Sequence, residues 1–163
     1  MKKIIAVFLS LITLVSFSTF NISATDINYE VPVILDFVLT SSLDSNIAAE
    51  NDTRASGLIF STALGIAKEG TNLLIQGKTL CSTEVVRCGF KDLMVQRRAT
   101  GDDPWKDYYE FGNVYVETSV ANLSTRLAVA RGYQYRVTCK HYAKKSLLVT
   151  QTISNTSNIV TVS

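Results

Sequence analysis

The sequence predicts an all-β protein, a sandwich of about seven short antiparallel strands. In the stretch 132–145, GYQYRVTCKHYAKK, apolar and aromatic residues alternate with polar ones, as in a strand with one wet face. Similar alternating segments recur along the chain at intervals of roughly 8 to 15 residues, separated by turn residues. No stretch of adequate length shows the period of an amphipathic helix. Together these observations favour strands over helices throughout.

Residues 1–24 have the layout of a secretory signal peptide. Lys2 and Lys3 precede an uncharged apolar run over 4–20, and Ala24 follows Ser23 at a plausible cleavage point. A retained membrane anchor is the alternative, but the run is short for a full span and no stop-transfer pattern follows it. We therefore expect the mature chain to be secreted or to lie at the cell surface.

Residues 25–53 differ in charge from the rest of the mature chain. This segment has six acidic residues and no Lys or Arg, whereas residues 54–163 have 14 basic and 8 acidic residues, an excess of six positive charges. The composition favours a poorly ordered acidic leader or linker. The apolar run 31–39 suggests an alternative, in which this part docks on the domain as an extra strand with its acids facing the basic surface.

Residues 54–163 are of a comfortable size for one β-sandwich domain. The first two strands are expected to form a hairpin around the turn 68–71, and a second turn is expected at 101–104, where Gly, Asp and Pro are concentrated. The expected strands are 58–66, 73–81, 89–98, 114–120, 123–129, 133–141 and a last segment, 147–162, interrupted at 154–158. Gly132 and residues 143–146 are expected to form the turns on either side of 133–141.

Two segments resemble fibronectin type III domains. LMVQRRATGDDPW, residues 93–105, resembles the C strand and its turn with a nearby Trp, and YQYRVTCKHYAKKS, residues 133–146, resembles the F strand with its aromatic-Arg-Val pattern. The resemblance implies an immunoglobulin-like, fibronectin type III-like sandwich. Residues 54–163 also resemble an uncharacterised family of small secreted proteins of Gram-positive bacteria, which implies no known activity. The matching features are Gly89-Phe90, Val95-Gln96-Arg97, Tyr135-Arg136-Val137 and the run 154–158.

The three cysteines are unexplained by this resemblance, because fibronectin modules normally lack a core disulfide. In an exported chain a close pair of thiols is expected to be oxidised. Cys81 and Cys139 have the inward parity on strands that face each other in such a sandwich, so we expect them to form a bridge. It would close a loop of about 59 residues, worth roughly 4 kcal/mol, against roughly 2.5 kcal/mol for Cys81 to Cys88. Cys88 to Cys139 is the next alternative.

We expect no catalytic, metal or cofactor site. His141 is the single histidine, and it shares the inward parity of Tyr135 and Val137, which favours a core residue over a base for a nucleophilic thiol. One His beside cysteines that are expected to be bridged is poor support for zinc. The sequence therefore predicts a protein that is not an enzyme.

Two groups of side chains are candidates for binding. Trp105 and Tyr109 lie in an aromatic segment after the second turn and would make a platform if exposed, although packing at the sheet edge is the simpler interpretation. The second group is basic and lies on the wet face and ends of neighbouring strands: Arg98, Arg136, Lys140, Lys144 and Lys145. A solvated face is the simpler interpretation, and a patch for an anionic polymer is the sharper one.

The function that we expect is binding at the cell surface or in the extracellular space, by an exported module that is not an enzyme. The partner would be an anionic cell-wall polymer or a surface protein, and nucleic acid is disfavoured because no binding motif is present. The alternative is a secreted effector or toxin-like protein, with the acidic segment as a pro-segment cleaved near Arg54.

Overall fold

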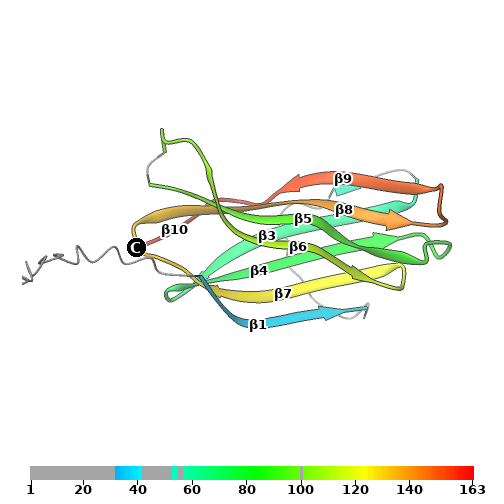
Figure 1. Cartoon of the computed structure of the whole chain (residues 1–163), viewed down its shortest axis with the longest axis horizontal. Coiled ribbons are helices and arrows are strands. Elements are labelled where there is room, and N and C mark those ends of the chain that lie inside the picture. Colours follow the sequence, from blue (N-terminus) through cyan, green and yellow to red (C-terminus); the bar gives the residue numbers. More distant parts are fainter. Residues whose placement is uncertain (1–31, 42–52, 55–56, 100) are drawn as a thin grey trace, which may run out of the picture.

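The computed structural model describes residues 32–41, 53–54, 57–99 and 101–163. The predicted signal peptide, residues 1–24, lies outside the described residues, as does most of the predicted leader. The described chain forms two antiparallel sheets and contains no helix (Figure 1), so the predicted all-β sandwich is confirmed. The described residues form ten strands, where about seven were expected: β1 (Val33–Thr40), β2 (Thr53–Arg54), β3 (Ile59–Glu69), β4 (Asn72–Cys81), β5 (Arg87–Arg98), β6 (Lys106–Val116), β7 (Val120–Ala128), β8 (Tyr133–Lys144), β9 (Thr150–Thr156) and β10 (Val160–Val162).

The first sheet has the strand order β1-β7-β4-β3-β2. The expected hairpin is present as β3 and β4, joined at Gly70 and Thr71. In β4 buried and half-buried residues alternate without exception, so one face lies on the core, as the sequence pattern predicts.

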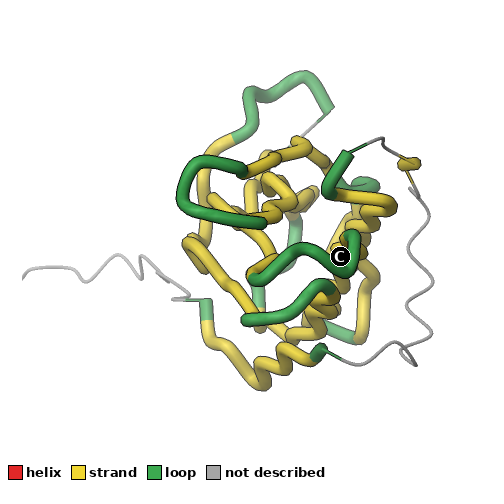
Figure 2. The backbone as a smooth tube through the Cα atoms, turned by 90° about the vertical axis from the view of Figure 1, so that its right-hand side faces the viewer, coloured by secondary structure: helices red, strands yellow, loops and turns green. Residues whose placement is uncertain are grey.

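The second sheet has the order β10-β8-β5-β6, and β9 pairs with β8 beside β10. The last segment of the chain thus forms two short strands along one edge of β8, with a break at 157–159 instead of 154–158. The aromatic segment before Val116 belongs to β6, a full strand that begins eight residues earlier than expected. Figure 2 looks along the strands and shows the two sheets enclosing the core between them.

The core is apolar and lies between the sheets. Its largest fully buried side chains are Tyr135, Phe90, Ile59, Leu64, Leu73, Ile75, Leu93, Leu123, Leu127, His141, Val95 and Val137. Most of them are branched aliphatic or aromatic residues, which pack well on a pleated surface. Burial of this set is the main source of stability, because apolar area removed from water is the dominant favourable term in folding.

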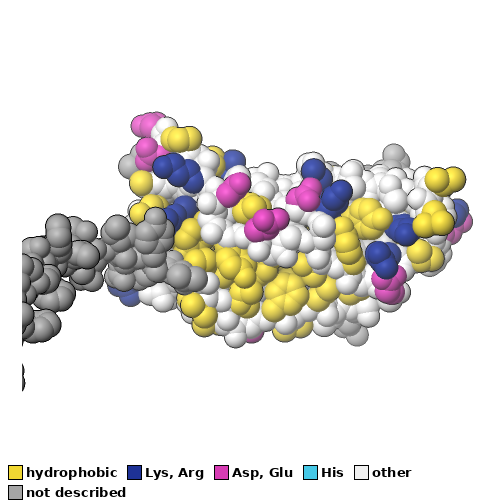
Figure 3. Space-filling model, viewed as in Figure 1, with side chains coloured by type: hydrophobic (Ala, Val, Ile, Leu, Met, Phe, Trp, Pro, Cys, Tyr) yellow, Lys and Arg dark blue, Asp and Glu magenta, His cyan; other side chains and the backbone are white. Residues whose placement is uncertain are grey.

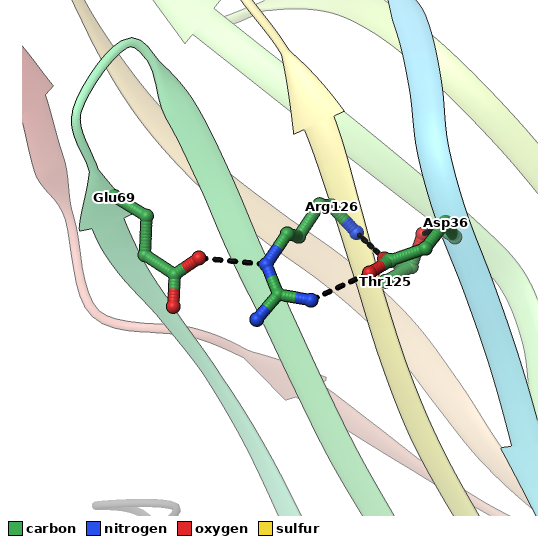
Figure 4. Close-up of polar contacts among 4 residues, drawn as sticks. All are labelled: Asp36, Glu69, Thr125 and Arg126. Atoms are coloured by element: carbon green, nitrogen blue, oxygen red, sulfur yellow. Dashed lines mark hydrogen bonds and ion pairs between the residues drawn. The ribbon is translucent and has the colours of Figure 1, made fainter.

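The domain includes residues that the sequence assigned to a leader. Strand β1 pairs antiparallel with β7, from Val33 opposite Ala128 to Thr40 opposite Asn122. Asp36 is its polar anchor: its carboxylate accepts hydrogen bonds from the backbone N–H of Arg126, at 2.7 Å, and from the Arg126 guanidinium, which also donates to Glu69 (Figure 4). The expectation of a poorly ordered segment is therefore wrong for 33–40, and the docked-strand alternative describes it.

Candidate functional site

The outer face of the second sheet carries a stack of one aromatic ring and two cations. The guanidinium groups of Arg98 and Arg136 both lie over the Trp105 ring, with their Cζ atoms 4.5 Å and 4.4 Å from the ring centroid. Three elements bring them together: Arg98 ends β5, Arg136 lies in β8, and Trp105 directly precedes β6. Because β5 pairs with both β6 and β8, residues distant in sequence meet on one face.

Polar contacts on the same face hold the two arginines in place. Arg98 donates from Nε to Gln134 Oε1 at 2.8 Å and from Nη1 to the carbonyl oxygen of Gly101 at 2.6 Å. Arg136 donates from Nε to Gln96 Oε1 at 2.9 Å. The described residues thus accept from two nitrogens of Arg98 and from one nitrogen of Arg136.

The charge of this stack is not neutralised by an ion pair. Among the described residues, neither Arg98 nor Arg136 forms one; the nearby Asp107 accepts a hydrogen bond from Gln96 instead, at 2.8 Å. Burial lowers the pKa of Arg136, and the positive charge of Arg98 lowers it further. Two like charges held this close favour an anion between or beside them, because the anion relieves their repulsion.

The other predicted patch residues lie apart from the stack. Lys140 pairs with Asp92 at 2.9 Å, and this contact lowers the pKa of the Asp92 carboxyl. Lys145 pairs with Glu84 of the β4–β5 connection. Lys144 lies opposite Arg87 at the far end of the sheet. Exposed pairs of this kind contribute little to stability, but their charge is already compensated.

The predicted aromatic platform is divided between the two faces of the sheet. Tyr109 packs edge-on against Phe111, with ring centroids 4.9 Å apart, and both rings are half-buried against the core. Trp105 belongs instead to the cationic stack. A second stack was not foreseen: Arg97 lies over the rings of Tyr108 and Tyr133, at 4.5 Å from each centroid. The Arg97-Arg98 pair was visible in the sequence, but only strand pairing shows which rings its members meet.

His141 is a core residue, as its parity predicts. Its side chain is fully buried, and burial lowers its pKa to about 4, so the ring is neutral at pH 7. Thr79 Oγ1 lies 2.8 Å from His141 Nδ1 and donates to the carbonyl oxygen of Gly89 at 3.2 Å. The single hydroxyl proton of Thr79 is donated to Gly89, so Thr79 Oγ1 must accept a hydrogen bond from a protonated His141 Nδ1. The unprotonated Nε2 of His141 then faces Asn155 Nδ2 at 3.5 Å.

No disulfide joins the three cysteines in the structure. All three are buried free thiols in the structure, so the predicted Cys81 to Cys139 bridge is not present. Cys81 and Cys88 instead interact with each other, and this interaction lowers the pKa of Cys81 and raises that of Cys88. Cys139 lies elsewhere on β8, and burial raises its pKa to about 12, which keeps it protonated.

Comparisons with protein-family models, with curated proteins and with solved structures find no match to this chain. Within the described ranges, no three His, Cys, Asp or Glu side chains are grouped so that they could hold a metal ion. The same part of the chain contains no helix with the length and apolar character that crossing a membrane needs.

Proposed function

We propose that this protein is an exported binding module, not an enzyme, whose outer β5–β8 face binds an anionic polymer at or outside the cell surface. The observation that carries the proposal is the contact of Arg98 and Arg136 with one Trp105 ring, where neither cation has an ion-pair partner among the described residues. Guanidinium groups suit this role because their donors match phosphate and carboxylate geometry. Phosphate-rich cell-wall polymers are the ligand class that this chemistry fits best.

The proposal gives each residue of the site a role. Arg98 and Arg136 contact the anionic groups, and Trp105 holds both guanidinium groups through cation–π contacts with its ring. Gln134 and Gln96 orient the two side chains by accepting hydrogen bonds from Arg98 Nε and Arg136 Nε. Arg98 Nη1 donates to the carbonyl oxygen of Gly101, so the ligand in this proposal contacts Arg98 Nη2 and the Nη groups of Arg136. A repeating polyanion gains from such a site because neighbouring charges on one chain can bind in succession.

The test uses Trp105, the single tryptophan of the chain, as its probe. Titration with a poly(glycerol phosphate) teichoic acid is expected to change Trp105 fluorescence, and added salt is expected to weaken binding. Arg98→Gln and Arg136→Gln are each expected to weaken it by roughly tenfold or more, since hydrogen bonds to charged groups are among the strong ones. Lys145→Gln is the matched control, because it removes a cation already paired with Glu84. Binding that ignores salt, or that Lys145→Gln reduces equally, contradicts the proposal.

We also propose that the sandwich is immunoglobulin-like. Support comes from Tyr135, which lies near the start of β8 and donates from its hydroxyl to the carbonyl oxygen of Ala130 at 2.8 Å. This resembles the tyrosine corner of such domains, where a Tyr donates to backbone a few residues upstream. The sheet of β3, β4 and β7 facing β6, β5 and β8 is consistent with it.

The effector alternative, with an acidic segment removed near Arg54, has less support. Such cleavage would detach β1 from the chain, although β1 pairs with β7 along its whole length. Asp36 would leave with it, and Arg126 would lose one of its two carboxylate partners. A segment with these contacts is part of the folded domain rather than a separate cover.

A further inference from the structure

We propose that Cys81 and Cys88 form a disulfide when the protein folds in an oxidising compartment, and that Cys139 stays a reduced, buried thiol. The inference concerns the end of the sandwich opposite Trp105, since Cys88 lies at the start of β5 and Arg98 at its end. It does not depend on the proposed ligand.

Both partners are held at the connection between the two sheets. Cys81 is the last residue of β4 and Cys88 the second residue of β5. They are 4% and 0% exposed and belong to the same apolar cluster. The connection 82–86 is fastened on both sides: Ser82 N–H donates to the carbonyl oxygen of Leu58, and Val86 N–H to that of Lys144. The connection therefore holds both cysteines in the same buried region at this end of the sandwich.

The two thiols affect each other unequally. Their interaction lowers the pKa of Cys81 and raises that of Cys88. Cys81 is therefore the thiol that is more readily deprotonated, although burial opposes this. Because the thiolate is the nucleophile in disulfide exchange, Cys81 is the better attacking group of the pair.

Cys139 is too far along β8 to pair with Cys88. The residue of β8 opposite Cys88 is Ala143, and Cys139 lies four positions before it. At the usual rise per residue of a strand, this is a displacement of about 13 Å. The Cα atoms of a disulfide are normally within about 7 Å of each other.

Cys139 is also displaced from Cys81, its expected partner across the core. Thr79 and His141 mark where β4 and β8 face each other, with 2.8 Å between Oγ1 and Nδ1. Cys81 lies beyond Thr79 toward the end of the sandwich that holds Cys88 and its β8 partner, Ala143. Cys139 lies on the other side of His141, toward the opposite end of β8. The two cysteines therefore diverge from this contact point, although they share the inward parity from which the sequence predicted their bridge.

The oxidation is written with a low-molecular-weight disulfide, such as oxidised glutathione, as the oxidant. The Cys81 thiolate attacks one sulfur of the oxidant, forms a mixed disulfide and releases one thiolate. Cys88 then loses its proton and attacks the Cys81 sulfur, which forms the protein disulfide and releases the second thiolate. Two protein thiols are oxidised and one disulfide is reduced to two thiols, so electrons and protons balance.

The experiment refolds the reduced chain, residues 25–163, with a mixture of reduced and oxidised glutathione, and then alkylates it in denaturant without reduction. The expected product carries one alkyl group, on Cys139, and non-reducing peptide mapping recovers a Cys81–Cys88 linked peptide. Cys139→Ser is expected to form the same linked peptide and to take up no alkyl group. Cys81→Ser and Cys88→Ser are each expected to leave two alkylated cysteines.

Two results would overturn the proposal. One is a linked peptide that contains Cys139 in the native chain. The other is three alkylated cysteines after refolding in oxidised glutathione, with circular dichroism showing that the chain has folded. Cys81→Ser or Cys88→Ser could prevent folding. The Cys139→Ser variant still tests the proposal in that case, because it keeps both Cys81 and Cys88.

Discussion

A buried histidine connects the two sheets of this protein. His141 of β8 donates to Thr79 of β4, and Thr79 donates to the carbonyl oxygen of Gly89 of β5. The hydrogen bonds satisfy polar groups that would otherwise be costly inside the core. The arrangement needs a neutral ring, because a second ring proton would replace the acceptor that faces Asn155 and would place a charge in an apolar site.

This neutrality predicts a pH-dependent stability. The pKa of His141 is lowered from 6.5 to about 4 in the folded state, so the unfolded state binds the proton more readily. The free energy of unfolding is therefore unaffected by His141 above pH 6.5, and it decreases as pH falls from 6.5 toward 4. The expected loss in free energy of unfolding is about 3 kcal/mol, at 1.36 kcal/mol per pKa unit. Denaturant unfolding of the wild type and of His141→Asn, which removes the titrating ring, measures it. Parallel pH profiles of the two would contradict the prediction.

Strand β5 is the element that builds the candidate site. Its register against both β6 and β8 shifts near Lys91 and Asp92, and Asp92 has a positive φ of 53°. Before this bulge Phe90 points to the core, and after it Leu93 and Val95 do. An extra residue in one strand changes the alternation of its two faces. The bulge thereby gives Gln96 and Arg98 the outward parity that places Arg98 beside Trp105.

Gly89 is the position at which this strand tolerates least change. It has a φ of 154°, and a Cβ added there would lie 2.1 Å from the carbonyl oxygen of Val114 and 2.9 Å from the Cα of Tyr115. Gly89→Ala is therefore expected to force β5 and β6 apart and to destabilise the domain by about 2 to 4 kcal/mol. The measurement is the denaturant midpoint.

Gly101→Ala is the control for this substitution. Nothing lies within 4 Å of its added Cβ, and its carbonyl oxygen can still accept from Arg98. Its denaturant midpoint is expected to change little. Equal midpoints for the two alanine variants would show that the β5–β6 contact is not as close as described.

At the scale of the whole molecule, β1 protects an edge of the first sheet. It covers β7, and Phe37 packs on Phe111 of β6 with ring centroids 5.9 Å apart, so that β1 closes one side of the sandwich. In the view of Figure 3, apolar side chains gather over this side and charged ones lie mostly above them. The exposed apolar side chains of β1 are Val33, Ile34, Leu35, Phe37 and Val38.

A chain that begins at Thr53 tests this role. Without β1, strand β7 becomes an uncovered edge, and uncovered edges pair with other chains. We expect lower stability than the chain 25–163 and concentration-dependent self-association in size-exclusion chromatography with light scattering. Asp36→Asn in the longer chain is the control, because it weakens one ion pair and keeps the strand. If the shorter chain is equally stable and stays monomeric, β1 is dispensable.

Much of the fold was accessible from the sequence because alternation is a local property. The pattern from Leu73 to Cys81 directly predicts β4, and the pattern from Tyr133 to His141 predicts most of β8 and its buried face. Alternation did not predict strand β1, residues 33–40, because apolar residues occur on both of its faces. An edge strand that is held by a polar contact, here that of Asp36 with Arg126, need not alternate. Alternation also missed that Phe90 and Leu93 share a face, since the bulge between them interrupts the period.

The sequence by itself determined the all-β class, the inward parity of Cys81, Cys139 and His141, and the outward parity of Arg136, because side-chain direction in a strand follows its period of two. Only the tertiary structure decided which residues meet. The alternation shows which face of the sheet a side chain occupies. It does not show which residues of neighbouring strands lie opposite that side chain, because this depends on the register between strands. Register therefore separates Cys139 from Cys88 along β8, and it brings Arg98 and Arg136 to the same Trp105 ring.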